Sequence, residues 1–254
     1  MDAVRWDFLP HELFVAGALA GLYGIQGERL PRWRLACFAG GLVLVVATAV
    51  TPLDSLATTS LLTAHLLQNV FLAEWAPALV VLGVPAGLAT RLGRRSVVRL
   101  FTHPAVALPL WVATYAAWHL PAAYDAALHR QSSLIHVEHA TYFATGVLFW
   151  WPLLQDAPRR LSYGARAVYV FVAFVLASPL GIVLSLLSRP AYDFYVDAPN
   201  MWGLSDLSDQ QIAGVTMSVE QAVVFFCVAT YFVLRHLRAE EARETRLGES
   251  SQIA

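Results

Sequence analysis

The strongest constraint on the fold of this sequence is a series of long apolar segments separated by short polar connections. A helix needs about 20 mostly apolar residues to cross the hydrocarbon core of a bilayer. Seven segments approach this requirement: residues 9–25, 35–50, 56–84, 104–120, 134–154, 167–187 and 211–234. The pattern predicts an all-α fold, a polytopic bundle of seven transmembrane helices that forms one integral-membrane domain over residues 1–254.

Composition supports a chain that is surrounded by membrane lipid. The 254 residues are 57% hydrophobic and 14% charged, whereas soluble globular chains are about 25% charged. The net charge is −1, and no basic groove indicates a nucleic-acid partner. The two cysteines, Cys37 and Cys227, lie far apart in apolar segments and predict no disulfide framework.

The basic residues, all of which are arginines, predict the orientation of the bundle. Short cytoplasmic loops of membrane proteins carry an excess of arginine and lysine. Of the 17 arginines, 14 fall in alternate connections, at residues 26–34, 86–103, 155–166 and 235–254. We therefore expect the N-terminus outside, the C-terminus in the cytoplasm, and residues 235–254 as a cytoplasmic tail.

Histidines concentrate on the predicted outer side. Five of the eight lie at the outer edge or in the outer leaflet: His65, His119, His129, His136 and His139. Imidazole suits copper, zinc and iron, and a thioether selects Cu(I). Met217 is expected at a similar outer depth in the seventh helix.

These placements predict a metal site of His65, His119, His136, His139 and Met217. His136 and His139 are three residues apart and share a helix face. Glu138 points about 200° away from His136, so we expect it to favour the helix N-terminus and not to bind metal. In the alternative interpretation, the histidines are interfacial anchors or hydrogen-bond partners between helices.

A second polar level lies deeper in the membrane. Glu74 is about 13 Å below His65 on the third helix, and Glu220 is about 16 Å below Asp209 on the seventh. We expect the two carboxyls at comparable depth, protonated or hydrogen-bonded, because unpaired charge is expensive there. Gln68, Asn69 and Gln221 are candidate donors.

Helix phase predicts that the third helix is central in the bundle. Gln68 and Asn69 share the face of His65, whereas Glu74 lies about 180° round the helix. With polar groups on opposite faces, neither face suits lipid. Pro77 removes the hydrogen bond to the Ala73 carbonyl and predicts a kink beside Glu74.

Several motifs resemble those of the CtaG-type cytochrome c oxidase assembly proteins, which are bacterial membrane proteins with seven helices. The resemblance covers most of the chain. Its motifs are Ala64-His65-x-x-Gln68, Ala76-Pro77 with Gly83-x-Pro85, Trp118-His119-Leu120-Pro121-x-x-Tyr124-Asp125, His136-x-Glu138-His139, Phe149-Trp150-Trp151-Pro152 and Asp209-Gln210-Gln211 leading to Met217.

The resemblance implies a non-enzymatic factor in the plasma membrane that matures haem–copper oxidase of the respiratory chain. Its partners would be oxidase subunits or other assembly factors, and copper is the expected metal. The polar residues that carry over include His65, Gln68, Asp209 and Gln210.

Three positions depart from the family pattern. Asn69 stands where a second histidine is usual, Glu74 where an apolar residue is usual, and Glu220 within a run that usually resembles Trp-Val-Pro-Gly. These departures keep two alternatives open. One is a proton, cation or small-solute transporter that uses Glu74 and Glu220, and the other is a membrane protein that binds haem between two histidines.

Overall fold

The computed structural model describes residues 31–128, 133–196, 198–199 and 201–253, together with residues 4, 6, 17, 20, 21 and 24. Every regular element within these residues is helical, which confirms the predicted all-α class. The elements are α2 (Arg32–Val50), α3 (Pro52–Thr59), α4 (Leu62–Val70), the π-helix η1 (Phe71–Trp75), α5 (Ala76–Gly83), α6 (Ala86–Gly93), α7 (Ser96–Phe101), α8 (Pro104–Trp118), α9 (Pro121–Leu128), α10 (Ser133–Leu154), α11 (Tyr163–Leu186), α12 (Asp193–Val196) and α13 (Asp206–Ile253).

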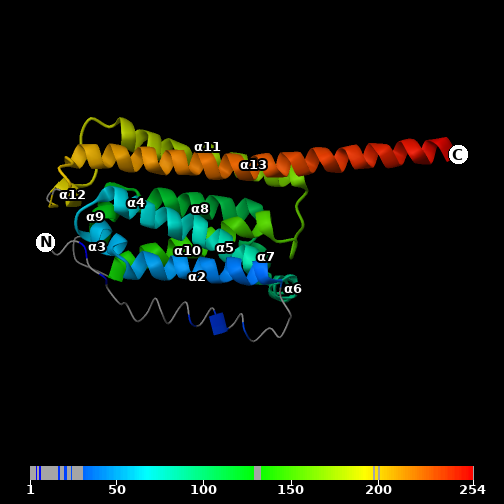
Figure 1. Ribbon diagram of the computed structural model, residues 1–254, viewed down its shortest axis with the longest axis horizontal. Helices are drawn as coiled ribbons and strands as arrows, with labels where there is room; N and C mark the ends of the chain where they lie inside the picture. The colour runs from blue at the N-terminus through cyan, green and yellow to red at the C-terminus, as the bar shows by residue number, and fades with distance from the viewer. Residues whose placement is uncertain are drawn as a thin grey trace.

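The long helices run along one common axis. In Figure 1, α11 and α13 lie side by side as one layer, and α2, α4, α5, α8 and α10 form the rest of the bundle beneath them. The short helices α3, α9 and α12 close one end, whereas α6 and α7 lie at the other. The buried core fills the space between the layers and is rich in aromatic side chains, including Trp111, Phe149 and Phe225.

Within the described residues, four stretches are long and apolar enough to cross a membrane: Arg32–Val50, Leu62–Gly83, Tyr163–Leu186 and Asp206–Glu249. The helix α8 is apolar but has 15 residues, and α10 has 22 residues with polar groups near its start. Helices therefore occupy six of the seven predicted segments. The first, residues 9–25, lies almost wholly outside the described residues, so the count of seven stays a prediction.

The third predicted segment, residues 56–84, is not one continuous helix. It breaks at Ser60 and Leu61, where Leu61 is extended at φ −130° and ψ 119°. The break exposes the first N–H groups of α4, which need acceptors. The Asp209 carboxylate supplies them from α13, because it accepts from Leu62 N at 2.6 Å, Thr63 N at 3.3 Å and Thr63 Oγ1 at 2.6 Å. A tertiary contact thus decides where α4 begins.

Below α4 the helix widens into the π-helix η1, which contains Glu74. Pro77, the second residue of α5, provides no N–H for the Ala73 carbonyl. That carbonyl instead accepts from Trp111 Nε1 at 3.4 Å. Gly146 of α10 packs against the same carbonyl so closely that a Cβ there would lie 2.4 Å from the oxygen. The structure has a π-helix beside Glu74, whereas the kink expected at Pro77 stays a prediction.

Burial confirms that the third segment is central. Within Leu62–Gly83, 67% of the span is buried, against 28–39% for the other three membrane-length helices.

The helices α11 and α13 approach each other through glycines. A Cβ on Gly181 would lie 2.9 Å from Gly214 O, and one on Gly214 would lie 2.6 Å from Gly181 O. Small residues allow this close approach between helices in membranes.

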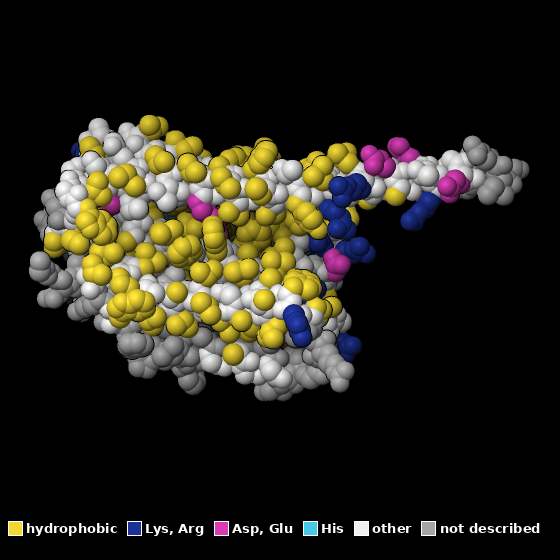
Figure 2. All heavy atoms as spheres, in the orientation of Figure 1, with side chains coloured by type: hydrophobic (Ala, Val, Ile, Leu, Met, Phe, Trp, Pro, Cys, Tyr) yellow, Lys and Arg dark blue, Asp and Glu magenta, His cyan; other side chains and the backbone are white. Residues whose placement is uncertain are grey.

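The helix α13 continues well past the bundle. Its 48 residues correspond to about 72 Å at 1.5 Å per residue, which is more than twice the roughly 30 Å hydrocarbon core. The segment expected as a tail, residues 235–254, is therefore largely a projecting continuation of this helix. Figure 2 shows apolar side chains over the bundle and arginines gathered at the end from which α13 projects. We call this the arginine-rich end.

Candidate metal centre opposite the arginine-rich end

Four ionisable side chains from three elements meet inside the bundle, near the end closed by α3, α9 and α12. His65 comes from α4, His119 caps the C-terminus of α8, and Glu138 and His139 lie in the second turn of α10. Their exposed fractions are 0%, 5%, 0% and 8%. We call these four residues the histidine cluster.

A tyrosine fixes the ring orientation of His65. Burial raises the pKa of the Tyr195 hydroxyl well above its usual range, so that the group keeps its proton. Tyr195 donates this proton to the carbonyl of Ala57 at 2.6 Å. The Tyr195 hydroxyl oxygen also lies 3.0 Å from His65 Nδ1. Because the only proton of the hydroxyl is directed to Ala57, Nδ1 must be the donor. His65 is therefore protonated at Nδ1.

The other nitrogen of His65 faces a carboxylate. His65 Nε2 lies 3.3 Å from Glu138 Oε1. With Nδ1 already protonated, a neutral His65 would turn a lone pair toward a negative oxygen. The contact is favourable only when a proton lies between the two atoms or when a cation joins them. Asn69 Nδ2 also donates to Glu138 Oε1, at 2.9 Å, and helps to hold it in place.

His119 follows the same pattern. Its Nδ1 lies 2.8 Å from the Tyr115 carbonyl, which can only accept, so Nδ1 is the donor. The Tyr142 hydroxyl lies 3.2 Å from the same nitrogen. His119 Nε2 is left deprotonated in the neutral ring, is buried, and has no hydrogen-bond partner.

Aromatic rings connect the members of the cluster. The Tyr124 ring lies 4.8 Å from that of His65 and 6.2 Å from that of His119, measured between centroids. The His65 and His139 rings meet edge to face at 6.4 Å. Four buried atoms of the cluster lack hydrogen-bond partners: Nε2 of His65, His119 and His139, and Oε2 of Glu138.

The cluster brings together three of the five predicted metal ligands. It includes His65, His119 and His139, but His136 is exposed one turn earlier on α10. Met217 is buried, and its Cε lies against Gly181 of α11, 3.0 Å from where a Cβ would stand. Among the described residues, no three His, Cys, Asp or Glu side chains are already gathered as metal ligands.

The expectation for Glu138 was wrong. It is fully buried and contacts His65 and Asn69, instead of serving the N-terminus of its own helix. The error arose because His136 was assumed to point into the site, whereas it lies on the exposed face of α10. The buried face of α10 repeats at helical spacing through Ile135, Glu138, His139, Tyr142, Thr145, Gly146 and Phe149.

The tyrosines of the site were also missed. Tyr195 stands in the short helix α12, outside every predicted span, so no apolar pattern marked it. The Asp125 carboxylate accepts from the backbone N–H groups of Asp193 and Phe194, at 3.3 Å and 3.1 Å, and so positions α12 over the cluster.

Other predicted polar residues hold backbone in place. Gln68 donates to the Thr48 carbonyl at 2.7 Å and to Asp54 at 2.9 Å. Gln210 accepts from Ala191 N at 2.6 Å and donates to the Leu184 carbonyl at 3.2 Å. Together with the hydrogen bonds from Asp209 of α13 to the start of α4, these contacts connect helices at the same end of the bundle.

At the deeper polar level, Gln221 is the one of the three expected donors that contacts Glu74, because Gln68 and Asn69 donate elsewhere. Gln221 Nε2 donates to Glu74 Oε1 at 2.9 Å and to the Tyr115 hydroxyl at 3.0 Å. Trp75 Nε1 donates to Glu220 Oε1. Glu74 Oε2, Glu220 Oε2 and Gln221 Oε1 are buried without partners, so this level has an excess of acceptors. Tyr115 connects the two levels, since its carbonyl accepts from His119.

Comparisons with known proteins place the chain in a family. A model of the cytochrome c oxidase caa3 assembly factor family (Caa3_CtaG) matches residues 15–239. An uncharacterised protein of Mycobacterium leprae is 25% identical over 240 residues, which is 84% of this chain and 36% of that protein. An uncharacterised protein of Mycobacterium bovis is 24% identical over 262 residues, 92% of this chain and 39% of that protein.

The chain thus spans well under half the length of these relatives. No solved structure matches. Because the family model covers most of the chain and includes every residue of the histidine cluster, the chain belongs to the cytochrome c oxidase caa3 assembly factor family.

Proposed function

We propose that this protein assists the assembly of haem–copper cytochrome c oxidase by holding copper in the histidine cluster, for delivery to a nascent oxidase subunit. In this proposal it is a non-catalytic protein of the bacterial plasma membrane. The cluster faces the outside, and the arginine-rich end faces the cytoplasm, in agreement with the excess of arginine there.

One observation supports copper binding above the others. Nε2 of His119 and of His139 is buried without a partner, and Nε2 of His65 faces only the Glu138 carboxylate, at 3.3 Å. In two of these imidazoles, His65 and His119, Nδ1 is held as a donor. Histidines that bind metals are typically held in this way, with the second ring nitrogen donating to a carbonyl or another acceptor. Imidazole nitrogen is a suitable ligand for copper.

The remaining groups fit a cation in the same place. The Glu138 carboxylate would offset positive charge beside His65, and Asn69 keeps it oriented. Binding would require small rotations of the rings, because the nitrogens do not yet converge. Copper would be cargo for the oxidase, and the chain's own residues bind it, orient it and shield it from water.

The first test is copper binding by the purified protein. We expect His139→Ala to reduce bound Cu(I) to background, because His139 belongs to the buried cluster. His136→Ala should retain binding, since His136 is exposed, and His236→Ala at the arginine-rich end is the matched control. Copper content is measured by atomic absorption after equilibration with Cu(I). Unchanged binding by His139→Ala would refute the ligand assignment.

The cellular test addresses the assembly role separately. After deletion of the gene, the oxidase is purified and its haem and copper are quantified. We expect haem to be retained and copper to be deficient. An oxidase with its full copper content would argue against copper delivery even if the isolated protein binds the metal.

A second candidate function is proton or cation movement through the deeper level. It is favoured by the three unpartnered acceptor oxygens of Glu74, Glu220 and Gln221. We expect Glu74→Gln with Glu220→Gln to abolish any proton flux in proteoliposomes, because the amides cannot take up a proton. Copper binding by the same variant should persist. Flux that is unchanged in the double variant would exclude this candidate.

The haem alternative is disfavoured by packing. The His65 ring is covered by Tyr124 at 4.8 Å, and its Nε2 faces Glu138 at 3.3 Å. A macrocycle between His65 and His139 would have to displace both groups. An absorption spectrum of the purified protein tests this alternative directly.

A further inference from the structure

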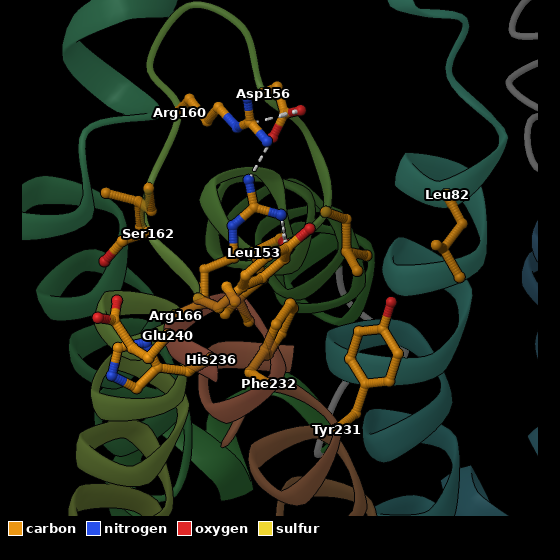
Figure 3. A pocket seen from close by; sticks show the side chains of 14 residues that line it. Leu82, Leu153, Asp156, Arg160, Ser162, Arg166, Tyr231, Phe232, His236 and Glu240 are labelled. Carbon is orange, nitrogen blue, oxygen red and sulfur yellow. Dashed lines mark hydrogen bonds and ion pairs between the residues drawn. The ribbon is translucent and has the colours of Figure 1, made fainter. Parts of the chain in front are cut away.

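A cavity of about 650 Å³ lies at the arginine-rich end, far from the histidine cluster. Its walls come from the end of α10, the connection to α11, the start of α11, and the part of α13 where that helix leaves the bundle. Figure 3 shows Arg166 between Asp156 and Arg160 on one side and His236 and Glu240 on the other. None of these residues takes part in the proposed copper site.

Arg166 is the buried charge of the cavity. It is 7% exposed, its Nη1 donates to the Leu153 carbonyl at 2.9 Å, and its Nη2 pairs with the Asp156 carboxylate. Its Nε is buried without a partner. A buried guanidinium N–H without an acceptor is costly, so Arg166 would be stabilised by a ligand oxygen that reaches Nε after a small rotation of the side chains around it.

The charges around Arg166 favour an anion. Arg160 Nε lies 3.8 Å from the same Asp156 carboxylate. Two guanidinium groups thus share one carboxylate, which leaves one positive charge in this triad. Across the cavity, Glu240 lies 3.9 Å from Arg243, which offsets its charge. Guanidinium groups match the geometry of phosphate oxygens.

The other walls are apolar and aromatic. Leu82, Leu153 and Phe232 line the cavity on the side of the bundle. Tyr163 and Tyr231 stand at its rim, where Arg235 donates to their hydroxyls at 2.7 Å and 3.3 Å. Tyrosine and arginine in this arrangement are typical of the level of the lipid headgroups. A ligand that fits must combine an anionic head with an apolar body.

We propose that this cavity binds an anionic phospholipid of the adjacent leaflet. The phosphate accepts from Arg166 and Arg160, and an acyl chain lies along Leu82 and Phe232. A free phosphate would use the guanidinium groups but leave the apolar wall uncovered. Basic pockets between helices at this level of a membrane protein bind anionic headgroups in general.

The test is native mass spectrometry of the full-length protein in detergent, with equimolar phosphatidylglycerol and phosphatidylcholine. We expect phosphatidylglycerol to be retained several-fold more than phosphatidylcholine. Arg160→Gln should remove this preference, because the exposed Arg160 supplies one of the two guanidinium groups that would bind the phosphate. Arg99→Gln, an exposed arginine of α7 at the same end, should retain it.

Three results would overturn the proposal. Equal loss of phosphatidylglycerol in Arg160→Gln and Arg99→Gln would indicate general attraction to the arginine-rich end. Equal retention of phosphatidylcholine would indicate an apolar groove without headgroup recognition. Complete displacement of the lipid by millimolar inorganic phosphate would indicate a site for a free anion.

Arg166→Lys provides a second variant. It keeps the positive charge but lacks the Nε–H, so this variant should bind phosphatidylglycerol more weakly.

Discussion

At the scale of single residues, the main lesson is how protonation is fixed inside the histidine cluster. His65 has two partners, and the Tyr195 hydroxyl decides the tautomer because its own proton is used by Ala57. The consequence appears at Nε2, which faces Glu138 and requires a proton or a cation. A tyrosine in the short helix α12 therefore controls the chemistry of a histidine on α4.

Removing this hydroxyl is expected to weaken copper binding. In Tyr195→Phe, His65 Nδ1 loses its acceptor and the ring loses its fixed orientation. Losses of this kind lower metal affinity by about 10–100-fold. The measurement is Cu(I) affinity by competition with a chromogenic chelator. Tyr231→Phe, at the arginine-rich end, serves as the control, and equal affinities for the two variants would show that Tyr195 does not position the ligand.

At the scale of elements, the third predicted segment is the least regular part of the molecule. It consists of α3, a break at Ser60 and Leu61, α4, the π-helix η1 and α5. Each irregularity is stabilised from a neighbouring helix: Asp209 of α13 caps α4, and Trp111 of α8 donates to the carbonyl that Pro77 leaves free. π-Helices are frequent at functional sites, and this one contains Glu74.

Substitution of Gly146 tests how closely α10 packs against this segment. A Cβ at Gly146 would lie 2.4 Å from the Ala73 carbonyl oxygen and 2.7 Å from Pro77 Cγ. Neither neighbour is a flexible side-chain end, so we expect Gly146→Ala to destabilise the protein by about 1–3 kcal/mol.

The readout is the thermal unfolding midpoint in detergent, which should fall. Gly40→Ala on α2 is the matched control, because its Cβ would meet only Leu79 Cδ1 at an ordinary 3.8 Å. If both variants unfold at the same temperature as the parent, α10 does not pack this closely against the π-helix.

At the scale of the whole molecule, polarity is divided between the two ends. The histidine cluster and the contacts of Asp209 and Gln210 lie at one end, and most of the arginines, the cavity beside Arg166 and the projecting part of α13 lie at the other. Between them lies the level of Glu74 and Glu220. In the proposed function, cargo is handled at the end that holds the histidine cluster, and the arginines anchor the other end.

The predicted orientation can be measured by labelling cysteines in whole cells. The free cysteines Cys37 and Cys227 are first replaced by serine. Single cysteines are then introduced at Trp202 and Leu247, which are 71% and 62% exposed at opposite ends. We expect an impermeant maleimide to label position 202 in intact cells and position 247 only after lysis. The reverse pattern would invert the assigned topology.

The sequence by itself determined the helical class, the positions of six helical segments and the central place of the third segment. These follow from local composition and phase, because apolar length and 3.6-residue periodicity are properties of one segment at a time. It also determined the depth of Glu74 relative to Glu220, since the rise per residue is fixed. His65, His119 and His139 were predicted as neighbours because each lies near the outer end of its predicted helix.

Only the tertiary structure decided which residues complete the site. Glu138 was correctly separated from His136 on the helix, but His136 was taken as the ligand and Glu138 was expected at the helix N-terminus. Tyr195 lies in a connection without periodicity. The break before α4 depends on Asp209, 147 positions later in the chain than Leu62. Such contacts join residues far apart in the chain, and a local pattern contains no information about which distant group will supply an acceptor. The histidines could thus be found from spacing, whereas their protonation and their partners required the packed bundle.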